Sequence, residues 1–182
     1  MPLKACCGLF ESLNPMEITH SQGSYHVEFR ALMPSDLHSA YVVTDRIVAE
    51  RWKASFPDPS RVLALPPGES TKSLIWLERV ASWLAEKGAD RKSTIAAFGG
   101  GVVGDLVGFA AATYMRGVRY LQVPTTLLAQ VDSSVGGKVA VDLPEGKNLV
   151  GAFYPPEVVT IDTTFLKDRK STRLNSSHAN IS

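Results

Sequence analysis

Cysteine is scarce in this sequence: Cys6 and Cys7 are the only two among 182 residues. Neighbouring cysteines are poorly placed to pair with each other, and no C-x-x-C spacing is present for a metal. The composition therefore excludes a disulfide-stapled fold and a cysteine-ligated zinc site. We expect unpaired thiols in a reducing, cytoplasmic compartment.

Long apolar runs and an excess of charge of one sign are also missing. No stretch approaches the roughly 20 apolar residues that a membrane span needs, and the N-terminus has no signal-peptide h-region. Lys and Arg number 19 against 18 Asp and Glu, a net charge of +1. This balance gives no indication of a nucleic-acid or membrane partner, so we expect a soluble protein.

The composition that is present, 45% hydrophobic and 20% charged, is typical of a globular domain. We expect residues 1–22 to be an irregular leader and residues 23–167 to form one α/β domain with a parallel sheet and flanking helices. Strands are predicted at Ser24–Arg30, Ser39–Asp45, Arg61–Leu65, Lys92–Phe98, Val118–Pro124 and Glu157–Asp162, the second and third of them buried. Helices are predicted within 46–56, 70–89 and 105–116 and at the start of 125–137, and a β-hairpin around Pro-Glu-Gly in 138–154.

A glycine motif lies between one predicted strand and the next helix. Gly99, Gly101 and Gly104 match G-x-G-x-x-G, where backbone amides and a helix dipole can hold a phosphate. An ordinary Rossmann site also has an acid about 20 residues later, and none is found there. The motif alone leaves dinucleotide binding and a tight structural turn equally open. Asp105 suits the first helical turn by its charge, yet it would repel a phosphate placed directly over it.

Polar residues are spaced through an apolar scaffold further along the chain. The segment "VPTTLLAQVDSSVGGK" offers hydroxyls, an aspartate and a lysine after a strand that ends at a proline. The segment "EGKN" adds Lys147 and Asn148. Such spacing is typical of a ligand site rather than of a surface loop.

Three long blocks carry a resemblance to a known family. "GGGVVGDLVGFAAATYMRGV", "QVPTTLLAQVDSSVGGK" and "EGKNLVGAFYPP" resemble, in this order, the N-terminal half of the 3-dehydroquinate synthases. The resemblance runs from about Tyr25 to Lys167 and implies a Rossmann-like NAD-binding α/β domain. The family's all-helical C-terminal domain would be missing from this chain.

The resemblance also implies a reaction of the shikimate pathway. The family converts 3-deoxy-D-arabino-heptulosonate 7-phosphate to 3-dehydroquinate and phosphate. NAD transiently oxidises a ring hydroxyl, phosphate is eliminated, the hydride returns, and an aldol step closes the carbocycle. The enzyme is therefore a carbon–oxygen (phosphate) lyase.

The cofactor contacts that the resemblance implies come from six segments. Asp45 would lie near the adenosine ribose, and the glycine loop would meet the pyrophosphate, with Asp105 reaching polar groups of the cofactor. The full set is Asp45, Glu69, Lys72, Gly100, Gly101, Val102, Val103, Gly104, Asp105, Thr125, Thr126, Lys147, Phe165, Leu166 and Lys167. Without the resemblance, Lys72 and Lys147 would be solvated lysines and Thr126 a helix N-cap.

The implied substrate contacts are fewer. Lys138 and Arg116 could pair with the phosphate and carboxylate, while Asp132 and Asn148 could hold ring hydroxyls. Arg116 would reach the active site of a neighbouring subunit, which implies a homodimer. By charge alone, Arg116 would merely suit a helix C-terminus, and Asp132 would be a surface acid.

The resemblance stops before the family's metal site. A divalent zinc or cobalt ion would be held by a glutamate and two histidines that lie beyond this chain, so we predict no metal ligand within it. Residues 168–182 break the family pattern and are expected to be a non-native tail. The chain could then be an inactive, NAD-binding fragment, or part of another sugar-phosphate cyclase such as a 2-deoxy-scyllo-inosose synthase.

Overall fold

A central seven-stranded sheet organises the computed structural model, which describes residues 14–20 and 23–167. The strand order is β1-β2-β9-β6-β5-β3-β4, and every pairing is parallel except that of β1 with β2. The sheet consists of β1 (Met16–His20), β2 (Gly23–Phe29), β3 (Ala40–Asp45), β4 (Val62–Leu65), β5 (Thr94–Gly99), β6 (Arg119–Pro124) and β9 (Val158–Ile161).

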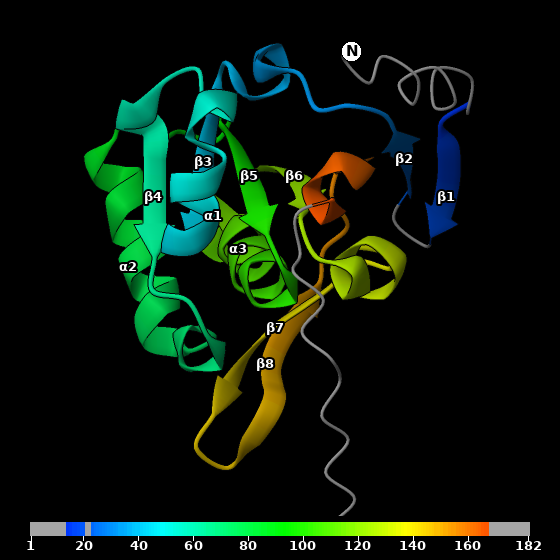
Figure 1. Cartoon of the computed structure of the whole chain (residues 1–182). Coiled ribbons are helices and arrows are strands. Elements are labelled where there is room, and N and C mark those ends of the chain that lie inside the picture. Colours follow the sequence, from blue (N-terminus) through cyan, green and yellow to red (C-terminus); the bar gives the residue numbers. More distant parts are fainter. Residues whose placement is uncertain (1–13, 21–22, 168–182) are drawn as a thin grey trace, which may run out of the picture.

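A separate antiparallel hairpin and three α-helices complete the fold. The hairpin joins β7 (Lys138–Leu143) to β8 (Gly146–Phe153), and it lies below the sheet in Figure 1. The helices are α1 (Arg46–Arg51), α2 (Leu74–Glu86) and α3 (Gly101–Thr113). None of the helices among the described residues is both long and apolar enough to cross a membrane. The predicted α/β class and hairpin are confirmed.

Both faces of the central strands are covered, because successive side chains of a strand point to opposite sides. On β5, Ile95 and Ala97 join a core with α2, α3 and β7, whereas Ala96 and Phe98 join a core with α1 on the other face. The strands β3 and β5 are buried throughout apart from Asp45, which is half-buried. Two-sided burial is what their almost continuous apolar runs predict.

Three sequence-based expectations about elements are wrong. Met16–His20, expected within an irregular leader, forms β1, whose Ile18 packs against the small core of β2 and β9. β4 is only partly buried, since it is the edge strand beside β3. α3 begins at Gly101, four residues earlier than predicted, and ends at Thr113. Close packing against β6 and β7 stabilises its glycines as helix despite their low propensity.

The connections reverse direction between β3 and β5. The chain leaves β3 through α1 toward β4, and it leaves β5 through α3 toward β6 on the opposite side. Thr44 and Phe98 are partners in this pairing, so Asp45 and Gly99 end the two strands side by side. In open parallel sheets, ligands bind in the crevice above such a switch point, at the carboxyl ends of the strands.

Candidate functional site

The N-terminus of α3 forms the floor of this crevice. Gly100 is the N-cap residue, and its carbonyl accepts the first helical hydrogen bond from the amide of Gly104 at 3.0 Å. A Cβ at Gly99 would lie 2.8 Å from Val103, and a Cβ at Gly101 would lie 3.1 Å from the Ser133 hydroxyl. Packing therefore requires the glycines, and the first amides of the helix need partners from outside it.

An ion pair between a buried lysine and a half-buried aspartate lies beside this helix terminus. The Nζ of Lys72 lies 2.5 Å from the Oδ2 of Asp105 and also donates a hydrogen bond to the Oδ1 of Asn148. Lys72 is only 6% exposed, so the alternative of a solvated lysine is wrong for this residue. Burial raises the pKa of the Asp105 carboxyl, and the Lys72 ammonium opposes that rise.

A second lysine contact lies further out. The Nζ of Lys147 donates to the Oε1 of Glu69 at 3.0 Å, which joins the hairpin turn to the 3₁₀ turn Glu69–Thr71. Both side chains are largely exposed. The pKa of Lys147 is raised by its hydrogen bond to Glu69. These two residues, with Lys72, place three of the predicted cofactor contacts around one end of the hairpin.

A pocket of about 700 Å³ adjoins the ion pair. Asp105, Asp132, Lys138 and Asn148 contribute its ionisable and amide side chains, while Val139 and Ala152 belong to its apolar lining. Asp132 lies in the π-helix Ala129–Ser133, and such turns recur at functional sites. The structure thus brings three of the four predicted substrate-binding residues together.

Arg116 is the exception. It is exposed, just after the end of α3, and α3 spans about 20 Å at its 13 residues. Met115 and Arg116 have positive φ angles of 49° and 68°, which are uncommon for residues other than glycine. Within one chain, Arg116 lies at the opposite end of α3 from the crevice.

Other predicted cofactor residues have structural partners. One Asp45 oxygen accepts from the amide of Val48 at 2.9 Å and caps α1. The Thr126 hydroxyl accepts from the amide of Ala129 at 3.2 Å, which is the capping role left open above. A Cβ at Gly100 would lie 3.1 Å from the Thr126 methyl group, so Thr126 also lies against the glycine loop.

The remaining predicted contacts have different surroundings. Thr125 is buried, and its amide donates to the carbonyl of Gly99 at 2.9 Å. Phe165 packs edge-to-face on Trp52 and Phe98, so its ring belongs to the core. Leu166 is half-buried, and Lys167 is exposed at the end of the described residues. Cys6, Cys7 and the proposed tail lie outside those residues.

Sequence reasoning missed Asp142. Its Oδ1 accepts from the amide of Asn148 at 2.8 Å, and its own amide donates to the carbonyl of Lys72 at 2.9 Å. It also missed the buried Gln130, whose Nε2 donates to the carbonyls of Pro124 and Asp162. An acid six residues before the asparagine of the same hairpin was the available signal for Asp142.

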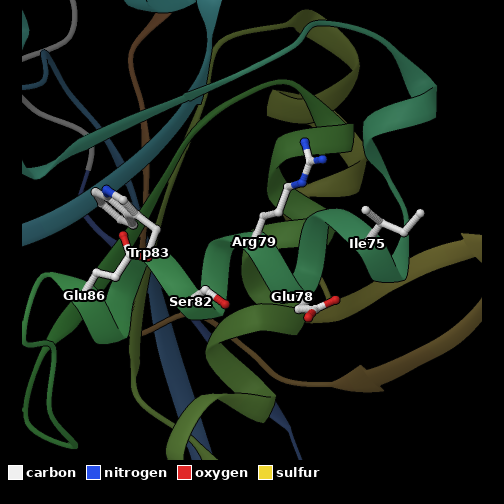
Figure 2. A pocket seen from close by; sticks show the side chains of 6 residues that line it. All are labelled: Ile75, Glu78, Arg79, Ser82, Trp83 and Glu86. Carbon is white, nitrogen blue, oxygen red and sulfur yellow. The ribbon is translucent and has the colours of Figure 1, made fainter.

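A separate hollow lies on the outer face of α2. Figure 2 shows Ile75, Arg79 and Trp83 along this helix, and Glu78, Ser82 and Glu86 complete the lining. The Arg79 guanidinium lies 4.4 Å from the centre of the Trp76 ring. No predicted site residue lines this hollow, so it is distinct from the crevice.

Comparison with known proteins identifies the family. The family model described as 3-dehydroquinate synthase N-terminal matches residues 62–176, which include the glycine loop, the π-helix and the hairpin. The chain belongs to the 3-dehydroquinate synthase family. The predicted resemblance is therefore confirmed.

Curated relatives agree with this family. A 3-dehydroquinate synthase of Clostridium kluyveri is 61% identical over 106 residues, 58% of this chain and 30% of the relative. One of Shouchella clausii is 52% identical over 140 residues, 75% and 38% of the two chains. The chain thus spans about a third of the length of these relatives.

Solved structures of cyclases share the fold. A 2-deoxy-scyllo-inosose synthase complexed with carbaglucose-6-phosphate, NAD⁺ and Co²⁺ is 29% identical, with a TM-score of 0.72 over 86% of this chain and 48% of that one. A 2-epi-5-epi-valiolone synthase of Streptomyces hygroscopicus with NAD⁺ and Zn²⁺ bound is 27% identical, with a TM-score of 0.73 over 82% and 46%.

Proposed function

We propose that this chain is the NAD-binding part of a 3-dehydroquinate synthase. The complete enzyme would convert 3-deoxy-D-arabino-heptulosonate 7-phosphate to 3-dehydroquinate and phosphate. One observation carries the proposal: the ion pair of Lys72 and Asp105 beside the N-terminus of α3 adjoins a pocket that contains Asp132, Lys138 and Asn148. In this proposal, the dinucleotide site and the oxyanion site would share one wall.

The residues present fit a dinucleotide. Gly100 and Gly101 carry no Cβ atoms toward Thr126 and Ser133, and the Ser133 hydroxyl has no hydrogen-bond partner among the described residues. The pyrophosphate would bind the first amides of α3, while Asp45 and Glu69 would accept hydrogen bonds from ribose hydroxyls. When bound, NAD would supply a reversible hydride acceptor, so a substrate hydroxyl could be oxidised and later restored.

The contacts proposed for the remaining residues follow from their charges and hydrogen-bonding groups. Lys138 would pair with the phosphate or carboxylate of the substrate, and Asp132 and Asn148 would hold its hydroxyls. Lys72 and Lys147 would place positive charge beside the cofactor. Arg116 would serve the site of a second subunit in a homodimer, since within its own chain it lies at the far end of α3.

Metal chemistry would come from the rest of the full-length enzyme. Among residues 14–20 and 23–167, no three His, Cys, Asp or Glu side chains gather as a metal-binding group. The two related cyclase structures contain Co²⁺ or Zn²⁺, and we propose that the full-length enzyme uses such an ion. We therefore expect the 182-residue chain to bind NAD⁺ without turning over substrate.

A related cyclase is the second candidate. The structural similarity to a 2-deoxy-scyllo-inosose synthase favours it, at 29% identity. The higher identity to curated 3-dehydroquinate synthases, 61% and 52%, favours the first proposal. Assay of a full-length enzyme containing this segment on both sugar phosphates would separate them.

Calorimetric titration of the 182-residue chain with NAD⁺ tests cofactor binding. Gly101→Val would place a branched side chain against Ser133 over the helix amides, so we expect its affinity to fall by about tenfold or more. Ser82→Ala, in the hollow on α2, is the matched control and should bind as the parent does. A parent chain that binds no NAD⁺ would contradict the proposal, and phosphate release by this chain alone would contradict its expected inactivity.

A further inference from the structure

We propose that Asp142 is a positioning residue that holds the hairpin turn where Asn148 and Lys72 meet. The inference rests on the proposed function, because Lys72 is assigned there to the cofactor and Asn148 to the substrate. Asp142 lines a hollow with Glu69 and Lys72, but it is not itself one of the proposed ligand contacts. We propose that it acts through Lys72 and Asn148.

The contacts of Asp142 join two distant segments of the chain. Its amide donates to the carbonyl of Lys72 at 2.9 Å, and Ser73 forms an isolated parallel bridge with Asp142. Its carboxylate accepts from the amide of Asn148 at 2.8 Å. A single residue at the end of β7 therefore fixes the backbone of both partners in the Lys72–Asn148 hydrogen bond.

The backbone of Asn148 requires such support. Its φ is +56°, a left-handed conformation that L-residues other than glycine adopt at a cost, asparagine less than most. With its amide bound to Asp142, Asn148 directs its carboxamide oxygen toward the Lys72 ammonium. The substrate-side residue and the cofactor-side residue are thus connected before any ligand binds.

Asp142 could support the turn by its negative charge or by accepting a hydrogen bond, and these two roles predict different results for Asp142→Asn. Ionisable side chains in this region include Glu69, Asp105, Lys72 and Lys147, and Glu145 lies in the turn itself. If Asp142 acted by its charge, removal of that charge would be enough to release Lys72. If it acts as a hydrogen-bond acceptor, Asp142→Asn keeps an oxygen for the Asn148 amide and should preserve the arrangement, whereas Asp142→Ala should not.

Chemical labelling of lysines tests the positioning without any cofactor. Acetylation rates of Lys72 and Lys92 would be measured by mass spectrometry in the 182-residue chain. We expect Lys72 to be protected in the parent and in Asp142→Asn, and to react about tenfold faster in Asp142→Ala, whose opened turn would expose it. Lys92, which is exposed and lies outside the hairpin, is the internal control, with similar rates in all three proteins. Equal protection of Lys72 in every protein, or equal exposure in both variants, would overturn the proposal.

Titration of the same variants with NAD⁺ tests whether the support that Asp142 gives to Lys72 and Asn148 affects cofactor binding. Asp142→Ala should weaken binding by about tenfold and Asp142→Asn by less than about threefold. A parent chain that binds no NAD⁺ would contradict the proposed function, while the labelling result would still decide the role of Asp142. If Asp142→Ala does not fold, Asn148→Gly keeps a permissive backbone and removes the carboxamide. Faster labelling of Lys72 in that variant would support the proposal, and an unchanged rate would overturn it.

Discussion

The two walls of the crevice are built differently. On the proposed cofactor wall, the apolar residues of α3 and β5 are buried, and Lys72 is enclosed with its partners. On the proposed substrate side, the segment that supplies Asp132 and the strand β8 carry exposed apolar side chains. Leu128, Val131 and Phe153 are exposed by 67%, 68% and 73%, and of these three Phe153 lines the pocket. The comparison teaches that the described residues stabilise the cofactor wall by their own packing. The substrate wall presents apolar surface of the kind that marks an interaction site.

Among the substitutions that test this comparison, the largest loss of stability is expected at Leu106. It lies on α3, is fully buried and belongs to the core between the sheet, α2 and β7. Leu106→Ala should lower the free energy of unfolding by about 3 kcal/mol, through lost burial and the cavity that remains. Urea denaturation of the 182-residue chain measures it. A loss below about 1 kcal/mol would show that the cofactor wall is not tightly packed.

The Lys72–Asp105 pair should give the next largest effect. Lys72→Met leaves a partly buried carboxylate without its cation, and we expect about 2 kcal/mol less stability at pH 7. The pKa of Asp105 is already raised by burial, and it should rise further without Lys72.

The raised pKa of Asp105 determines how stability changes with pH. A native carboxyl with a raised pKa binds its proton more tightly than the unfolded chain does, so stability falls as the pH rises from the ordinary aspartate pKa of 3.8 through the native pKa. The defect of Lys72→Met should therefore be small at low pH and large at pH 7. Urea denaturation at both pH values and NMR titration of the Asp105 carboxyl measure it. The exposed Lys147→Met is the matched control, with no measurable change expected.

Gly108 and Gly104 test how tightly α3 is packed on the cofactor wall. A Cβ at Gly108 would lie 2.4 Å from Val139 and 3.1 Å from Tyr120, so Gly108→Ala should cost about 1–2 kcal/mol despite its higher helix propensity. A Cβ at Gly104 would meet the end of the flexible Gln122 side chain. Gly104→Ala should therefore be less destabilising. Thermal melting of both variants compares them, and equal losses would contradict the packing argument.

Leu128 gives the smallest expected effect on stability. Because Leu128 is exposed, Leu128→Ser should change the free energy of unfolding by less than about 0.5 kcal/mol. The same change should reduce self-association in sedimentation experiments, since it removes exposed apolar surface. A loss of stability comparable to that of Leu106→Ala would erase the distinction between the two walls.

The sequence predicted most elements of the sheet because buried strands such as Ala40–Asp45 and Thr94–Gly99 carry unbroken apolar runs. It also identified the polar groups that gather in the pocket. It placed the start of α3 wrongly, because the helical state of Gly101 and Gly104 depends on contacts with Ser133 and Gln122 rather than on local propensity. It missed β1, whose short segment has only Ile18 packed against the adjoining core.

The contacts within the site were less accessible to sequence reasoning. Lysine is normally solvated, and nothing local to Lys72 shows that Asp105 and Asn148 enclose it. The role of Asp142 depends on the hairpin folding back over a segment that precedes it by 70 residues, from 72 to 142. Tertiary contacts of this range leave no periodic pattern in the chain.

The link between Lys72 and Asn148 also constrains how the molecule folds. It closes a loop of 76 residues, whereas the β5–α3–β6 unit connects neighbours in sequence. The entropy cost of ordering a long loop must be met before the contact that closes it forms. The sheet core can therefore assemble before the residues of the crevice come together. During synthesis on a ribosome, the proposed binding groups could come together only after the whole hairpin had emerged, so we expect ligand affinity to develop late in folding.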